Sequence, residues 1–231
     1  MMRKGHLSVP SGAGPFPGVI VLHDAFGLTG DVARQCAHLA ANGYLAYAPS
    51  LYEGGNPRCV KQVFQGALKG TGPVFDRIAE ARGALTARDD CTGYVAVAGF
   101  CLGGQFALIA GGRGLFDAAV VNYGLVPKDL DPLLTAPCPV VGSFGGKDTI
   151  VPVADVERYR EALTAASVPH DIKLYPDAPH GFIQSHGDPY KTMIRVGGMH
   201  HVPEDAQDAW TRIFAFLDTH LEPEFVSDPG F

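Results

Sequence analysis

The chain has 231 residues, of which 46% are hydrophobic, with 18 basic and 24 acidic side chains. This length fits one sizeable α/β domain, which we expect to occupy residues 1–231. The net charge of −6 and the lack of a basic stripe in the sequence predict that neither nucleic acid nor an anionic membrane surface is a partner.

The apolar runs and the cysteines indicate the compartment. No apolar run approaches the ~18 residues that span a bilayer, and the basic start of the chain is not followed by the apolar segment of a signal peptide. The five cysteines are scattered, odd in number and without a CxxC pair, which disfavours a disulfide framework and a structural zinc site. We therefore expect a cytoplasmic protein with reduced thiols.

Short apolar runs alternate with helical patterns along the chain. In chain order, the first half predicts a strand at Val19–Leu22, a helix at Thr29–Ala41, a strand at Tyr44–Ala48, and two helices between Pro57 and Ala87 separated at Gly70–Pro73. The second half predicts a strand at Tyr94–Ala98, a helix at Leu102–Ala110, strands at Asp117–Tyr123 and Pro139–Phe144, a helix at Pro152–Ala166, a strand at His170–Tyr175 and a helix at Pro203–Leu221. This alternation predicts an α/β fold with a mainly parallel central sheet and helices on both faces. Ligands of such sheets bind outside the carboxyl ends of the strands.

The segment GFCLG, residues 99–103, follows one of these strands directly and precedes a helix. It has the G-x-nucleophile-x-G pattern, in which the glycines permit a sharp turn that exposes the central side chain. A free cysteine is most often a small buried hydrophobe, but here Cys101 would lie at a helix N-terminus, which favours a thiolate. The segment does not match the G-x-G-x-x-G of a dinucleotide-binding loop. The context favours Cys101 as a nucleophile.

Two further side chains follow later strands. Asp148 lies between a strand and a helix, where an aspartate is often only a capping or turn residue. His180 lies between Pro179 and Gly181, just after the last strand. The chain order of nucleophile, acid and histidine is that of α/β-hydrolases, and the three residues supply nucleophile, orienting group and base.

A metal-binding alternative rests on His200, His201 and Glu204. These residues lack the HExxH order, and a glutamate at the start of a helix is explained by the helix dipole. We therefore predict no metal.

These motifs together resemble those of the dienelactone hydrolase family of α/β-hydrolases, also called carboxymethylenebutenolidase-like proteins. The resemblance runs from PGVIVLHDAFGL, residues 17–28, to the final helix, and its most specific pieces are GFCLGG, GGKD and HGF, at residues 99–104, 145–148 and 180–182. It implies an α/β-hydrolase fold and a Cys-His-Asp triad at Cys101, His180 and Asp148. It implies no cofactor.

The resemblance also implies roles for the first loop. Family members carry a glutamate that contacts the cysteine thiol, and Asp24, one methylene shorter, stands at this position. The backbone N–H groups of Ala25 and Leu102 would form the oxyanion hole. A plain alternative for Asp24 is a loop acid that hydrogen-bonds its own backbone.

Substrate recognition departs from the classical members of the family. They place an arginine four residues after the triad histidine to pair with a substrate carboxylate, whereas this chain has Gln184, which cannot form the charged bidentate fork. A second family arginine corresponds to Arg58 or Lys61, and the spacing does not decide between them. The substrate-binding candidates, each of which could equally be core or rim, are Phe26, Tyr52, Arg58, Phe100, Tyr123, Phe182 and Gln184.

We therefore expect an enzyme that hydrolyses a small-molecule ester or lactone through an acyl-thioester. The alternative function is that of a non-catalytic protein of α/β-hydrolase fold that binds a ligand or partner. Asp24 and Gln184, which depart from the family pattern, are compatible with this alternative. A redox role for Cys101 has no resolving cysteine nearby in the sequence to support it.

Overall fold

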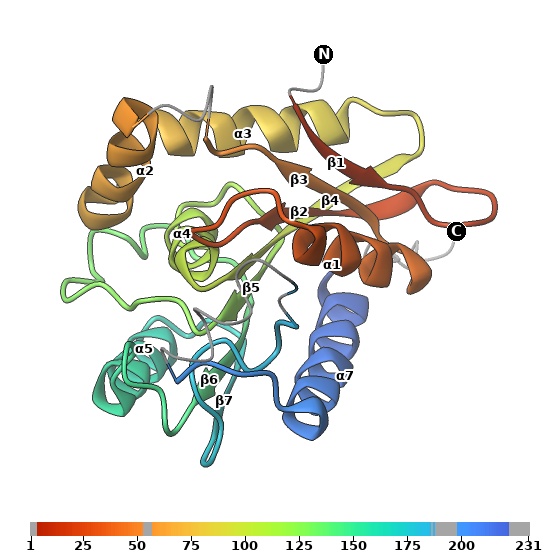
Figure 1. The fold of residues 1–231 in the computed structure, drawn as a ribbon. Helices are drawn as coiled ribbons and strands as arrows, with labels where there is room; N and C mark the ends of the chain where they lie inside the picture. The colour runs from red at the N-terminus through yellow and green to blue at the C-terminus, as the bar shows by residue number, and fades with distance from the viewer. Residues whose placement is uncertain (1–3, 53–56, 186, 188–197, 222–231) are drawn as a thin grey trace, which may run out of the picture.

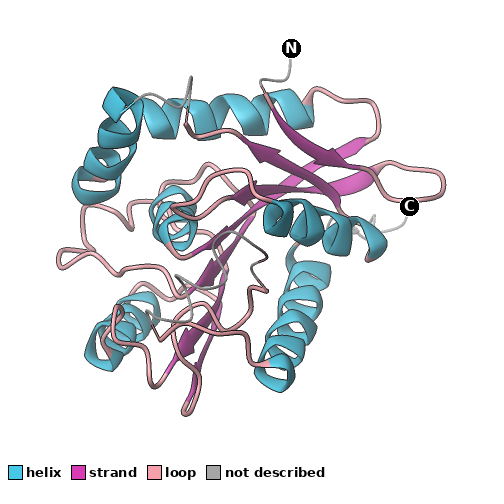
Figure 2. Cartoon of the chain, in the orientation of Figure 1, coloured by secondary structure: helices cyan, strands magenta, loops and turns pink. Residues whose placement is uncertain are grey.

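A single seven-stranded sheet forms the centre of the computed structural model, which describes residues 4–52, 57–185, 187 and 198–221. The strand order is β1-β3-β2-β4-β5-β6-β7, and every neighbouring pair is parallel except β1 with β3. The strands are β1 (Gly5–Ser8), β2 (Phe16–Leu22), β3 (Leu45–Pro49), β4 (Cys91–Phe100), β5 (Ala118–Asn122), β6 (Val140–Gly145) and β7 (His170–Tyr175). Figure 2 shows this twisted sheet running between the helices.

Helices cover both faces of the sheet (Figure 1). They are α1 (Gly30–Ala41), α2 (Pro57–Lys69), α3 (Pro73–Thr86), α4 (Leu102–Gly111), α5 (Val153–Ala165) and α7 (Pro203–His220). Helices α1 and α7 pack on one face, and α2, α3, α4 and α5 pack on the other. The predicted α/β architecture is thus confirmed, with a mainly parallel sheet between two helical layers.

Two hydrophobic cores follow from the alternation of side chains along the strands. In β2, Val19 and Val21 face α1 and α7, whereas Ile20 and Leu22 face the opposite layer. All four side chains are fully buried, as expected for a strand that is covered on both faces. All ten residues of α4 are buried as well, so this helix lies inside the molecule.

The N-terminal edge of the sheet differs from the sequence prediction. Strand β1, GHLS, was not predicted, because glycine, histidine and serine give no apolar alternation. It forms through antiparallel pairing with β3, in which His6 lies opposite Ala48. Strand β2 begins earlier than predicted, and its Pro17 lies where the register with β4 shifts between Phe16 and Gly18, a position at which a ladder tolerates proline.

The carboxyl ends of five parallel strands open onto the same edge of the sheet. Asp24 follows β2, Cys101 follows β4, Tyr123 follows β5, Asp148 follows β6 and His180 follows β7. Residues far apart in the sequence are therefore brought to one place by strand order alone. Among the described residues, no helix combines the length and apolar character needed to cross a membrane.

The burial of α4 generates a stability prediction. Phe106 is fully buried and packs edge-on against Phe75, with ring centroids 5.7 Å apart. Phe106→Ala should lower the free energy of unfolding by about 3–5 kcal/mol, because the cavity left behind adds to the lost transfer energy. Urea denaturation measures this change. Val9→Ala, at a residue that is 47% exposed, is the control and should change it by about 0.5 kcal/mol or less.

Candidate active site

Cys101 lies on a sharp turn between β4 and α4. Its φ of 55° and ψ of −118° are unusual for a residue with a side chain, and such strain persists only where the surroundings impose it. The Cys101 N–H donates to the carbonyl of Asn122 at 3.1 Å, which ties the turn to the end of β5. The side chain is half-buried at the N-terminus of α4, where backbone N–H groups and the helix dipole favour an anion.

Glycines on either side of Cys101 allow this turn. A Cβ atom at Gly99 would lie 1.9 Å from the carbonyl oxygen of Gly103, and one at Gly103 would lie 2.0 Å from that of Leu22. Both contacts are to backbone, which cannot move aside without separating α4 from the strands. The G-x-C-x-G spacing therefore meets a steric requirement, as the motif predicted.

Asp148 and His180 are directly joined. Nδ1 of His180 donates to Oδ2 of Asp148 at 2.8 Å, and both side chains are buried. The other carboxylate oxygen, Oδ1, accepts hydrogen bonds from the backbone N–H groups of Ile150 at 2.7 Å and Val151 at 3.0 Å. Asp148 is thus both a turn residue and the hydrogen-bond partner of His180, so the two roles considered for it from the sequence do not exclude each other.

The surroundings of His180 favour its protonated form. Burial alone lowers the pKa of this imidazole, but the hydrogen bond with Asp148, together with hydrogen bonding and charge from Cys101, raises it to about 9. With Nδ1 bound to Asp148, Nε2 is buried and has no hydrogen-bond partner of good geometry among the described residues. Nε2 is therefore the ring nitrogen that the hydrogen bond to Asp148 leaves available.

The loop after β2 is held by its own acid and by a neutral histidine. Oδ1 of Asp24 accepts the N–H of Phe26 at 2.8 Å. Nε2 of His23 accepts the N–H of Leu51 at 3.0 Å, so its Nδ1–H must be the donor to the carbonyl of Asp24 at 2.8 Å. Burial lowers the pKa of His23, in agreement with a neutral ring. The hydroxyl of Tyr52 donates to the carbonyl of Ala25 at 3.0 Å, which fixes the loop from the side.

A buried polar cluster joins this loop to the other strand ends. Nε2 of Gln184 donates to Oδ2 of Asp24 and to Oδ2 of Asp31, both at 3.0 Å, and its Oε1 accepts from the hydroxyl of Tyr123 at 3.1 Å. The ring of Tyr123 contacts that of His180 edge-on, with centroids 5.1 Å apart. Burial raises the pKa of Tyr123 well above its usual value, and the nearby charges of Asp31, Cys101, Asp24 and Asp148 raise it further.

Comparison with known proteins assigns the family. The profile of the dienelactone hydrolase family matches residues 4–221. The chain belongs to this family. Two relatives, both named "Putative carboxymethylenebutenolidase", come from Yersinia pestis and Methylorubrum extorquens. The Yersinia protein is 31% identical over 90% of this chain and 79% of its own, and the Methylorubrum protein is 32% identical over 89% and 73%.

Solved structures agree with this assignment. A crystal structure of a Klebsiella pneumoniae protein, described as a "Putative Dienelactone Hydrolase", has a TM-score of 0.70 and 28% identity, and the match covers 92% of this chain and 91% of that one. A dienelactone hydrolase-like promiscuous phosphotriesterase from metagenomic libraries has a TM-score of 0.76 at 23% identity, which supports the fold. The chain therefore has the α/β-hydrolase fold and is a carboxylic ester or lactone hydrolase of the dienelactone hydrolase family.

The other residues singled out from the sequence lie in different surroundings. Phe100, Tyr123, Phe182 and Gln184 are buried, whereas Phe26 and Tyr52 are half-buried beside the loop after β2. Lys61 is exposed on α2, and the side chain of Arg58 lies outside the described part of the chain. Of the substrate-binding candidates with a described side chain, Phe26 and Tyr52 are thus the two that keep some exposed surface.

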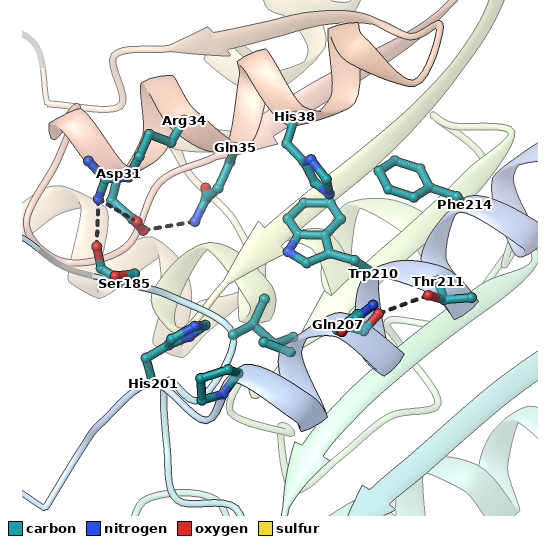
Figure 3. A pocket seen from close by; sticks show the side chains of 13 residues that line it. Asp31, Arg34, Gln35, His38, Ser185, His201, Gln207, Trp210, Thr211 and Phe214 are labelled. Atoms are coloured by element: carbon teal, nitrogen blue, oxygen red, sulfur yellow. Dashed lines mark hydrogen bonds and ion pairs between the residues drawn. The ribbon is translucent and has the colours of Figure 1, made fainter.

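A separate groove of about 480 Å³ lies between α1 and α7. Figure 3 shows Arg34 and Gln35 converging on Asp31 at one end of it and Trp210 and Phe214 at the other. Cys101, Asp148 and His180 do not line this groove. The described residues also contain no group of three histidine, cysteine, aspartate or glutamate side chains that could hold a metal ion.

Two polar residues of this region, Asp31 and His23, were not foreseen from the sequence. Asp31 stands in the first turn of a helix, where an acid needs no partner beyond the helix dipole. His23 precedes the loop acid without any pattern of its own. His23 is connected with the site only by its place at the end of a strand, directly before Asp24. No local signal in the sequence connects Asp31 with Gln184, 153 residues away.

The close approach at Gly103 generates a matched pair of substitutions. Gly103→Ala should lower the free energy of unfolding by about 3 kcal/mol or more, because the new Cβ meets a backbone carbonyl. Gly83→Ala in α3 meets no atom within 4 Å and should leave stability unchanged or raise it by up to about 1 kcal/mol. Chemical denaturation of both variants measures the difference. Equal stabilities would contradict the steric account of the turn.

Proposed function

We propose that this protein hydrolyses a small carboxylic ester or lactone through a triad of Cys101, His180 and Asp148. The observation that carries the proposal is the 2.8 Å hydrogen bond from Nδ1 of His180 to Asp148, which leaves Nε2 for exchange with Cys101. Membership of the dienelactone hydrolase family supports the reaction class.

In the resting site, His180 carries a proton and lies beside Cys101, the proposed nucleophile. The raised pKa of His180, about 9, means that the imidazole is protonated at neutral pH, and the positive ring favours the thiolate beside it. Asp148 holds the ring in one orientation and stabilises its charge. The N-terminus of α4 adds a favourable dipole at the sulfur.

Acylation begins with attack of the Cys101 thiolate on the substrate carbonyl carbon. A carbon–sulfur bond forms, and the carbonyl electron pair moves onto oxygen, where the N–H groups of Ala25 and Leu102 would donate to it. The pair then returns, the carbon–oxygen bond to the leaving group breaks, and Nε2–H of His180 gives its proton to the departing alkoxide. In a lactone the alkoxide remains attached to the acyl group.

Deacylation uses the same groups in reverse. Neutral His180 takes a proton from water through Nε2, and the hydroxide formed attacks the thioester carbon. The carbon–sulfur bond breaks, the thiolate of Cys101 returns beside the imidazolium, and a carboxylic acid product is released. The buried Asp148 keeps the ring in position through both steps.

A non-catalytic binding protein, the alternative considered from the sequence, does not explain three features of the site. A binding site needs no strained backbone at Cys101, no buried His–Asp pair, and no histidine whose Nε2 remains for Cys101. All three occur together at one strand edge, and together they suit nucleophilic catalysis.

Removal of the nucleophile is the primary test. Cys101→Ala should lower kcat/KM on 4-nitrophenyl acetate or a small lactone at least about 1,000-fold, because loss of a triad member leaves only the binding and oxyanion contributions. Cys91→Ala, at a half-buried cysteine outside the site, is the matched control and should retain activity. Unchanged hydrolysis by folded Cys101→Ala would rule out the proposal.

Alkylation tests independently whether Cys101 is the reactive thiol. Burial raises the pKa of Cys36 and of Cys138 to about 12, so neither thiol should react with iodoacetamide at pH 7. Cys101 should be labelled first, at one equivalent, with parallel loss of activity. Peptide mapping by mass spectrometry identifies the labelled residue.

The charge on His180 predicts a pH dependence. Since the imidazolium is the acid that protonates the leaving group, kcat/KM should fall as the pH rises through about 9. Asp148→Asn removes a group that raises this pKa, so the falling limb should move to lower pH. A falling limb at the same pH in both proteins would contradict the role of Asp148.

The raised pKa of His180 also affects the stability of the fold. The stability gained from the charged ring is complete below about pH 6.5 and is lost as the pH rises toward 9.

A further inference from the structure

The side chain of Gln184 is fully engaged inside the protein. Its Nε2 carries two hydrogens, and each has an aspartate acceptor at 3.0 Å, one on Asp24 and one on Asp31. Its Oε1 accepts the hydroxyl of Tyr123, and the residue is only 4% exposed. The opposite amide orientation would turn the oxygen toward two carboxyl groups, so the network itself fixes the orientation.

The acceptors of this amide come from different parts of the site. Asp24 precedes Ala25, whose N–H is the proposed oxyanion donor, and its carboxylate also accepts the N–H of Phe26. Gln184 itself lies on the turn of His180, because its backbone N–H donates to the carbonyl of Gly181 at 3.0 Å. One amide thus connects the loop that carries the oxyanion donor with the loop that carries the proton-transfer histidine.

We propose that Gln184 is a positioning residue that fixes the Ala25 loop relative to the His180 loop, and that it does not bind a substrate carboxylate. This inference rests on the proposed function, since it assigns the two loops their roles. It follows that Gln184 does not select anionic substrates, because both of its N–H bonds point to aspartates of the protein. An anionic substrate at this side chain would also approach two buried carboxyl groups.

The chain offers a matched control for this role. Gln35 is also a buried glutamine whose Nε2 donates to the same oxygen, Oδ2 of Asp31, at 3.0 Å, but it lies on α1 (Figure 3). Gln35→Met and Gln184→Met each replace an amide by an apolar side chain of similar length and remove one donor from Asp31. Only Gln184→Met removes the connection to Asp24 and Tyr123.

The kinetic test separates positioning from substrate binding. On 4-nitrophenyl acetate, Gln184→Met should lower kcat at least about tenfold with KM within about threefold, because a displaced catalytic group costs rate more than binding. Gln35→Met should keep kcat within about twofold. Equal losses of kcat in the two variants would reduce Gln184 to a general stabilising role and overturn the proposal.

Substrate charge gives an independent reading. The ratio of kcat/KM for mono-4-nitrophenyl succinate to that for 4-nitrophenyl acetate should be the same in Gln184→Met as in the wild-type protein. A KM that rises for the anionic ester alone, with kcat unchanged, would show that Gln184 contacts the substrate carboxylate, and the proposal would be wrong.

A readout without turnover separates this proposal from the proposed function. The pH midpoint of Cys101 alkylation by iodoacetamide should rise in Gln184→Met, since a less well placed His180 stabilises the thiolate less, and should stay at the wild-type value in Gln35→Met. If the wild-type protein hydrolyses no ester through Cys101, the proposed function fails, and this midpoint still decides the role of Gln184. Wild-type midpoints in both variants would overturn it.

Discussion

Between Phe100 and Leu102 the chain turns from the central strand into a buried helix with a φ of 55° at Cys101. The turn is possible because Gly99 and Gly103 leave room for backbone contacts that any Cβ would block. The hydrogen bond from Cys101 to Asn122 and the packing of α4 against β2 both depend on it. The proposed positions of the sulfur, the oxyanion donor at Leu102 and the dipole of α4 therefore all follow from one backbone constraint.

Around this turn, the buried carboxyl groups of Asp24, Asp31 and Asp148 all accept hydrogen bonds. Asp148 accepts three hydrogen bonds from Ile150, Val151 and His180. Asp24 and Asp31 share the amide of Gln184. Burying carboxyl groups is costly unless hydrogen bonds replace the lost water, and each of these acids meets that condition within the loops at the strand ends. The same bonds that satisfy the acids fix the loops that carry Ala25 and His180.

Much of this arrangement is readable from the sequence. The alternation of apolar runs with helical patterns predicted the parallel sheet, and the glycine spacing around Cys101 predicted the sharp turn. The chain order of Cys101, Asp148 and His180 predicted that these residues belong to one site. Strand β1 escaped prediction because its pairing with β3, not its own residues, makes it a strand. Gln184 was considered as a substrate contact or as an ordinary core or rim residue, because no local pattern reveals acceptors 160 and 153 residues earlier in the chain.

The dispersed origin of the site has a consequence for how the protein becomes active. Asp24, Cys101, Asp148 and His180 follow β2, β4, β6 and β7, and β7 is both the last strand in sequence and one outer edge of the sheet. Contacts between such distant segments form late, since the entropy of closing long loops must be overcome first. In the proposed mechanism, catalysis therefore requires the complete sheet, because a chain that has formed only β1 to β6 holds Cys101 and Asp148 but not His180.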